Sequence, residues 1–308
     1  MSLKLTILGC HSATPRSFAN PTAQYLEIND RGFLIDCGEG TQTQLRKYKI
    51  KFSQIKHIFI SHLHGDHIYG LIGLISSFGL LSRQTDLHVF APKELEGLIN
   101  MQLSITKSWV SFPIIFHPLT SKNSELIFED KKVEVHTIPM KHRIYTNGFL
   151  FKEKSKDRKL NMKTIKEHPQ IALCDYHKIK KGYDFTGAEG EIIPNSELTF
   201  DPPKILQYAF CSDTAYSKKI IPLIREVDLL YHESTFLEDN KALAKLTRHS
   251  TALEAATIAK EAGVKKLILG HYSSRYKNEA LFLSEASQVF SHVELAEQGK
   301  VFIINNQT

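Results

Sequence analysis

Three histidines and an aspartate stand in the last six positions of the stretch IFISHLHGDH, which spans residues 58–67. The apolar residues 58–60 that precede them predict a buried strand, and the apolar residues 68–81 that follow predict a helix. The turn between the two elements therefore carries imidazole and carboxylate groups, which are ligands that zinc prefers in proteins. We expect the chain to fold around a metal site at the end of this strand.

Predicted strands and helices alternate along most of the 308 residues. Strands are predicted at 4–8, 22–28, 32–36, 58–60, 87–91, 114–118, 126–130, 132–139, 147–152, 205–211, 227–231, 266–270 and 300–304. Helices are predicted after residue 41 as far as 49, and at 68–81, 93–103, 251–262 and 278–291. This alternation predicts an α/β fold with two sheets inside and helices outside.

Metal-ligand side chains also follow three other predicted strands. His142 comes after the strand at 132–139, Asp213 after the strand at 205–211, and His271 directly after the strand at 266–270. Because ligands in α/β folds collect at the carboxyl ends of strands, we expect all of these side chains to share one site.

The ligand types favour zinc, with manganese or iron as alternatives. We expect one ion to be bound by His62, His64 and His142, a second by Asp66, His67 and His271, with Asp213 bridging them. Two neighbouring ions can hold a hydroxide and stabilise a displacement at phosphorus or at an acyl carbon.

A polar, basic segment at 152–194 interrupts the alternation of strands and helices. It contains ten lysine and arginine residues and shows little periodicity, so we expect an inserted arm within one catalytic domain that spans residues 1–308. The formal net charge of +6 permits a polyanionic partner. The chain shows no signal peptide and no apolar run that approaches the ~20 residues of a membrane span, so a cytoplasmic location without a membrane partner is expected.

Six short motifs occur in an order that resembles one family. They are DCGEGTQ at 36–42, HLHGDH at 62–67, CSDT at 211–214, HEST at 232–235, HSTA at 249–252 and HYSSRY at 271–276. HxHxDH alone resembles the metallo-β-lactamase superfamily, and the last three motifs narrow the resemblance to the short form of the ribonuclease Z (tRNase Z) family. The resemblance covers nearly the whole chain.

This resemblance implies a four-layer αββα sandwich of the metallo-β-lactamase type. It implies an endoribonuclease that removes the 3′ trailer of precursor tRNA after the discriminator nucleotide, by attack of a dizinc-bound hydroxide. The tRNA would keep a 3′-hydroxyl, and the trailer would carry a 5′-phosphate. Two Zn²⁺ per chain are implied, with Mn²⁺ or Fe²⁺ as substitutes.

The resemblance also implies roles for individual side chains. Asp66 would accept a proton from the attacking water as well as bind metal. Glu233 would hold His249, and this pair would deliver a proton to the leaving oxygen. Asp36 would hydrogen-bond a ligand imidazole.

Substrate binding is implied at two further places. Ser273 and Arg275 would bind the phosphate, since a guanidinium offers a planar fork to its oxygens. The arm at 152–194 falls where the family carries its tRNA-binding exosite, and its lysines would contact phosphates. The residues at 168–182 lack the glycine- and proline-rich tip of the usual arm. The family's arm presents RNA to the site of a partner subunit, so a homodimer is implied.

Two alternatives remain open at the level of sequence. The same fold and metals could act on other phosphodiesters, such as small cyclic nucleotides or single-stranded RNA ends, which the altered arm tip would suit. The second alternative is an RNA-binding module that has lost catalysis, although every expected metal-ligand residue is present.

Overall fold

The computed structural model describes residues 2–305 and separates two compact units. The larger unit comprises the chain up to Glu153 and again from Leu206 to Asn305. The smaller unit, called the arm unit below, runs from Lys154 to Ile205. Each unit has its own apolar core.

The larger unit contains two sheets of seven strands each. The first sheet has the order β18-β1-β2-β3-β4-β5-β6 and the second β17-β16-β15-β14-β9-β8-β7. The strands of the first sheet are β1 (Ser2–Gly9), β2 (Ala23–Ile28), β3 (Arg31–Ile35), β4 (Ile55–Phe59), β5 (Leu87–Pro92), β6 (Ile114–Leu119) and β18 (Val301–Asn305). Those of the second are β7 (Leu126–Glu129), β8 (Val133–Pro139), β9 (Asn147–Glu153), β14 (Gln207–Cys211), β15 (Leu229–Glu233), β16 (Leu267–Gly270) and β17 (Val293–Leu295).

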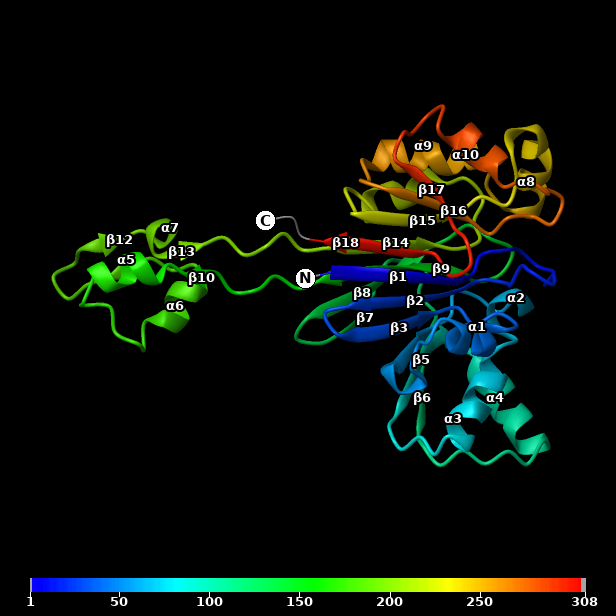
Figure 1. The fold of residues 1–308 in the computed structure, drawn as a ribbon, viewed down its shortest axis with the longest axis horizontal. Helices are drawn as coiled ribbons and strands as arrows, with labels where there is room; N and C mark the ends of the chain where they lie inside the picture. Colours follow the sequence, from blue (N-terminus) through cyan, green and yellow to red (C-terminus); the bar gives the residue numbers. More distant parts are fainter. Residues whose placement is uncertain (1, 306–308) are drawn as a thin grey trace. The chain divides into compact units, whose positions relative to one another are not determined.

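Helices cover the outer face of each sheet (Figure 1). Those on the first sheet are α1 (Thr41–Lys47), α2 (Gly65–Ile68), α3 (Leu71–Leu80) and α4 (Glu94–Ile105). Those on the second are α8 (Lys241–Thr247), α9 (Ala252–Ala262) and α10 (Ala280–Ala286), and short 3-10 turns lie at Phe52–Gln54, Lys218–Leu223 and Glu238–Asn240. Helix α9 begins with a capping box, in which Thr251 and Glu254 bond each other's backbone N–H.

The alternation of side chains along each strand creates two apolar layers. In β3, Phe33 and Ile35 belong to the core between the sheets, whereas Leu34 belongs to the core under the helices of the first sheet. Phe59 and Ile58 of β4 divide in the same way. The larger unit is thus the predicted four-layer sandwich.

The parallel strands end at a common edge. In the second sheet β14, β15 and β16 are parallel neighbours, with Cys211 opposite His232 and Glu233 opposite Gly270. In the first sheet β4 runs parallel to β3 and β5. The loops after these strands therefore carry their side chains to one region.

The arm unit is folded, although its sequence shows little periodicity. It contains β10 (Lys159–Leu160), α5 (Met162–Glu167), α6 (Tyr176–Lys180), β11 (Phe185–Thr186), β12 (Ile192–Ile193), α7 (Asn195–Leu198) and β13 (Thr199–Phe200). Its core consists of Ile165, Ile171, Ile179, Phe185, Ile193 and Leu198. The residues beyond 194, which lie outside the predicted arm, supply Leu198 of α7 to this core and form β13, which pairs with β10.

Most predicted elements agree with the structure to within a few residues, with two exceptions. The helix predicted at 68–81 is two helices, α2 and α3, which meet at Gly70. A Cβ at Gly70 would lie 2.1 Å from the carbonyl oxygen of Gly38, so the close passage of the 37–38 turn requires glycine there. The second exception is that the sequence did not reveal α8 and β17 of the larger unit. Within residues 2–305, no helix has the length and apolar character needed to span a membrane.

Candidate metal centre

The first group of predicted ligands lies together at the ends of three strands. His62 and His64 follow β4, and their Nε2 and Nδ1 atoms are 3.0 Å apart. Asp213 follows β14, and its Oδ2 atom lies 3.6 Å from Nε2 of His62 and 3.8 Å from Nε2 of His142. One ligand atom from each of these four residues lies within 4.8 Å of the others, a spacing that suits one metal ion.

The second group of predicted ligands adjoins the first. Nε2 of His271 lies 3.5 Å from Oδ2 of Asp66, and Nε2 of His67 lies 3.6 Å from the same oxygen. The other carboxylate oxygen of Asp213, Oδ1, lies 3.5 Å from His67 Nε2 and 3.2 Å from His271 Nε2. Asp213 therefore faces both groups with different oxygen atoms, as a bridging ligand would.

Among residues 2–305, four buried polar atoms at the centre of this cluster find no hydrogen-bond partner. They are Nε2 of His67, Nε2 of His142, Nε2 of His271 and Oδ1 of Asp213. Buried polar groups are nearly always satisfied, and these four converge on the same space. Cations held by the two groups would satisfy all four atoms, so the residues present fit divalent metal.

Carboxylates give the cluster a negative potential. Burial lowers the pKa of His67, but the charges of Asp66, Asp36 and Asp213 outweigh burial and raise it to about 10. His62 faces mainly other histidines, so burial and their charges hold its pKa well below the usual value. A potential that holds a proton on His67 also attracts a divalent cation. The His/Asp cluster is a divalent metal-binding site.

Asp36 holds one ligand imidazole in place. Its fully buried carboxylate accepts from Nδ1 of His67 at 2.7 Å through Oδ2, which leaves Nε2 of His67 facing the cluster. Ser61 donates to the same carboxylate from its backbone N at 2.8 Å and its hydroxyl at 2.9 Å. The turn bends sharply at Gly38, where a Cβ would lie 2.4 Å from the carbonyl oxygen of Asp66.

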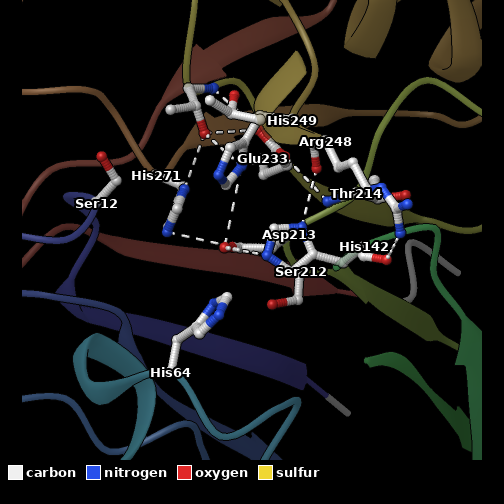
Figure 2. A network of polar contacts seen from close by, with 12 residues as sticks. Ser12, His64, His142, Ser212, Asp213, Thr214, Glu233, Arg248, His249 and His271 are labelled. Carbon is white, nitrogen blue, oxygen red and sulfur yellow. Dashed lines mark hydrogen bonds and ion pairs between the residues drawn. The ribbon is translucent and has the colours of Figure 1, made fainter. Parts of the chain in front are cut away.

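Thr235 contacts Glu233, His249 and His271, three residues that are labelled in Figure 2. Its Oγ1 lies 2.9 Å from Nδ1 of His271 and 3.2 Å from Nδ1 of His249, and it donates to Glu233 Oε2 at 2.8 Å. Sequence reasoning did not single out Thr235, although it lies in the HEST motif. The sequence feature that could have identified it is its position two residues after Glu233, the carboxylate at the end of β15.

Glu233 and His249 form the predicted pair beside the cluster. Nδ1 of His249 lies 2.9 Å from Oε1 of Glu233 and 3.9 Å from Oδ2 of Asp213. Burial lowers the pKa of His249, but the two carboxylates outweigh burial and raise it to about 9. Burial raises the pKa of Glu233, whereas the charge of His249 outweighs burial and lowers it. The two carboxylates therefore favour the protonated form of His249.

Arg248 orients His142, the histidine that follows β8. Nδ1 of His142 donates to the Arg248 carbonyl at 2.9 Å, and Nη1 of Arg248 donates to the His142 carbonyl at 2.6 Å. Arg248 adopts a left-handed conformation, with φ of 60°, at the end of α8. No motif in the sequence marked this contact.

Two site residues have backbone conformations that non-glycine residues seldom adopt. Asp36 has φ of 56° and His271 has φ of 63°. Such conformations persist only where the surroundings hold them, and they cluster at functional sites. At His271 the loop is fixed by its own N–H, which donates to the carbonyl of Cys10 at 2.7 Å.

Ser273 and Arg275 lie on the loop that follows His271. Ser273 is buried, and its N–H donates to the Thr235 carbonyl at 3.2 Å. The Arg275 side chain is exposed, and its N–H donates to Ser273 Oγ at 3.4 Å. Their role in phosphate binding stays a prediction.

The fold and the site together define the class of protein. The metallo-β-lactamase fold protein YhfI from Bacillus subtilis is similar, with a TM-score of 0.68, 19% identity and coverage of 98% of this chain and 100% of that one. At that identity the likeness shows the fold. The chain is a metallo-β-lactamase fold protein with a metal site at the ends of its strands.

Closer relatives identify the family. The chain is 44% identical to "Ribonuclease Z" of Bacteroides thetaiotaomicron over 305 residues, which are 99% of this chain and 96% of the relative. The crystal structure of human tRNase Z, short form, is also similar, with a TM-score of 0.70, 26% identity and coverage of 99% and 100% of the two chains. A family model described as "Anti-Pycsar protein Apyc1" matches residues 3–177, which exclude Asp213 and His271. The chain shares its first half with that family and over its full length belongs to the ribonuclease Z family, metallo-β-lactamase fold endoribonucleases, as predicted.

Proposed function

We propose that this chain cuts the 3′ trailer from precursor tRNA after the discriminator nucleotide, leaving a 3′-hydroxyl on the tRNA and a 5′-phosphate on the trailer. The observation that carries the proposal is the Glu233–His249 pair, 2.9 Å apart, beside a cluster of seven ligand residues in a chain 44% identical to a ribonuclease Z. A cytoplasmic location remains a prediction.

The site is proposed to hold two Zn²⁺ per chain, with Mn²⁺ or Fe²⁺ as substitutes. His62, His64 and His142 would hold one ion and Asp66, His67 and His271 the other, with Asp213 shared. When bound, the two ions lower the pKa of a water molecule and neutralise charge on the phosphate.

Asp66 is proposed to accept the proton of the attacking water. Its Oδ2 accepts from the backbone N–H of Ala13 at 2.7 Å, which fixes the carboxylate toward the cluster. Burial raises the pKa of Asp66, but the charge of His67 and the hydrogen bond from His271 hold it far below its usual value. The carboxylate form of Asp66 is therefore favoured, and its oxygen can accept a hydrogen bond from the attacking water.

His249 is proposed to protonate the leaving oxygen. Nδ1 of His249 is engaged by Glu233, which fixes the ring and leaves the proton on Nε2 for transfer. As the water oxygen bonds to phosphorus, the bond from phosphorus to the 3′ oxygen breaks, and that oxygen takes the proton. Ser273 and Arg275 would bind the phosphate from the neighbouring loop.

The arm unit is proposed to bind the body of the tRNA. Its two main helices carry exposed lysines, Lys163 and Lys166 on α5 and Lys178 and Lys180 on α6. Such charges bind the phosphate backbone without reading its sequence. A homodimer, in which one arm serves the site of its partner, remains a prediction that analytical ultracentrifugation would test.

The proposal is tested by incubating the purified protein with a 3′-extended tRNA precursor and added zinc or manganese. One cut after the discriminator is expected, with loss of activity on chelation and with His249→Ala. His136→Ala changes a histidine of β8 outside the cluster and should retain activity. If no discrete cut appears near the acceptor end with either metal, the substrate assignment is wrong.

A small phosphodiester is the second candidate substrate. The predicted ligands all belong to the larger unit, so the reaction itself does not need the arm unit. Comparing kcat/KM for a cyclic nucleotide with that for precursor tRNA decides between the two, because better use of the small ester would replace the tRNA proposal.

A further inference from the structure

A cavity of about 470 Å³ opens beside His249 in the larger unit. Its walls come from the loop after β8, the loop after β14, one face of α8 with the following His249, and α9. Helix α9 contributes Glu254, whose carboxylate accepts from the Thr251 N–H at 3.1 Å. The residues used below are Lys141, Ala215, Tyr216, Ala242 and Lys245. The roles proposed above leave this cavity without a ligand.

The walls are fixed to the metal centre by hydrogen bonds. Lys141 donates from its N–H to Thr214 Oγ1 at 3.0 Å and accepts at its carbonyl from the N–H of Ala215 at 2.8 Å. The last turn of α8 is held by the two bonds between Arg248 and His142 (Figure 2). The cavity is therefore present before any ligand arrives.

The chemistry of the lining suits a nucleotide. Ala215, Ala242 and the ring of Tyr216 offer apolar surface for the face of a base, and lysine stems extend such a surface while their ammonium groups stay in water. Lys241 is engaged with Glu238 at 2.6 Å. Within residues 2–305, no carboxylate forms an ion pair with the ammonium group of Lys141 or Lys245. Both ammonium groups can therefore bind a phosphate.

The position beside His249 decides which nucleotide the cavity would take. His249 delivers its proton to the 3′ oxygen that leaves phosphorus, so the nucleotide that carries this oxygen lies on the His249 side. We propose that this cavity binds the nucleotide on the 5′ side of the cut, with its base against Tyr216 and Ala242 and its own 5′ phosphate near Lys141 and Lys245. This inference rests on the proposed function and makes α8 a determinant of cleavage position.

The test combines a filled cavity with a missing base. Ala242 is an exposed residue of α8, so Ala242→Trp places a ring in the cavity while the helix core stays unchanged. Precursors are made with an abasic site either at the discriminator or at the first trailer nucleotide. For the wild type, the abasic discriminator should lower kcat/KM about tenfold, the order expected for one stacked base.

Coupling between the variant and the base is the informative result. On the intact precursor, Ala242→Trp should lower kcat/KM about as much as the abasic discriminator does in the wild type. For the variant, removal of the discriminator base should cause no further loss of kcat/KM. The variant should remain sensitive to the abasic trailer nucleotide. If the wild type cuts precursors but the variant keeps its full sensitivity to the discriminator base, or couples to the trailer base instead, the cavity is not this subsite. If the wild type cuts no precursor, the proposed function fails first.

A charge variant tests the same cavity without filling it. Lys245→Gln should weaken precursor binding and reduce the salt slope of log K by about one, because one phosphate contact is lost. Lys219→Gln removes an exposed lysine outside the cavity and should leave the slope unchanged. Equal effects from both variants, or no effect from Lys245→Gln, would contradict the proposal.

Discussion

Replacing Asp36 by Asn should weaken metal binding without removing any proposed ligand. The carboxylate is completely buried and accepts three hydrogen bonds, from His67 Nδ1 at 2.7 Å and from Ser61 at 2.8 and 2.9 Å. Asparagine has the same shape and tolerates the left-handed φ of 56° at this position, so the backbone need not move. The change isolates the charge and the acceptor capacity of the side chain.

An amide cannot satisfy all three donors. If its oxygen faces His67, its NH₂ group faces the Ser61 N–H, and two donors oppose each other. If it is flipped, the NH₂ group faces Nδ1 of His67, which must then accept, and the ring proton moves to Nε2, the atom that points at the metal. Loss of such a partner typically costs 10–100-fold in metal affinity, or about 1.4–2.7 kcal/mol.

The assay is a zinc titration of metal-free protein against a competing chelator. Asp228→Asn is the matched control, because Asp228 is 2% exposed, accepts from the Gln207 N–H at 2.8 Å and lies outside the cluster. The control should lower the free energy of unfolding and leave zinc affinity unchanged. If Asp36→Asn binds zinc as tightly as the wild type, or the control weakens binding equally, Asp36 does not set the orientation of His67.

Three further predictions follow from other parts of the molecule. Asp66→Ala should lower single-turnover cleavage by about 10²–10⁴-fold, and RNA affinity measured by filter binding should stay within about twofold if the residue acts in chemistry. Replacing 154–205 by a two-residue turn should abolish tight tRNA binding and spare hydrolysis of a small phosphodiester. Glu153 and Leu206 already pair across β9 and β14, with N···O distances of 3.0 and 2.8 Å, so the strand ends should stay in place. Loss of both activities would oppose a separate binding role for the arm unit. Burial and the nearby His88 lower the pKa of His57 to about 4, below the 6.5 of an exposed histidine, so the unfolded state binds the proton first. The free energy of unfolding should therefore fall by roughly 1–3 kcal/mol between about pH 6.5 and 4, and urea midpoints measure this fall. His57→Gln should lessen the fall. An equal fall in the wild type and the variant would mean that the acid sensitivity comes from another group.

The predicted ligands could be found from sequence because they obey a simple geometric rule. Strand ends in parallel sheets share an edge, so His142, Asp213 and His271 could be assigned to one region although they are far apart in the chain. The contacts that hold these ligands do not follow such a rule. Thr235 bonds three residues of the site and Arg248 bonds His142 through a carbonyl, and neither contact leaves a periodic or compositional trace in the sequence.

The arm unit shows the opposite case. Its core is small, and its apolar residues Ile165, Ile171 and Ile179 lie in separate short elements among charged residues. Neither a helical nor a strand period develops over such lengths, so the composition suggested an irregular basic segment. Only the packing of Leu198 of α7 in this core and the pairing of β13 with β10 show that the arm unit extends beyond residue 194.

The distribution of the ligands between the sheets implies that the metal also stabilises the fold. His62, His64, Asp66 and His67 come from the loop after β4 of the first sheet and from the following helix α2, whereas His142, Asp213 and His271 follow strands of the second. Bound ions would therefore join the two halves of the sandwich. At free zinc about 100 times the Kd, the native state gains about 2.7 kcal/mol, which for a unit of this size raises the melting temperature by about 5–10 °C. Calorimetry with zinc and after chelation measures this shift, and Asp213→Ala, which removes the shared carboxylate, should reduce it. A melting temperature that does not respond to metal would mean that the ligands do not bind an ion across the two sheets.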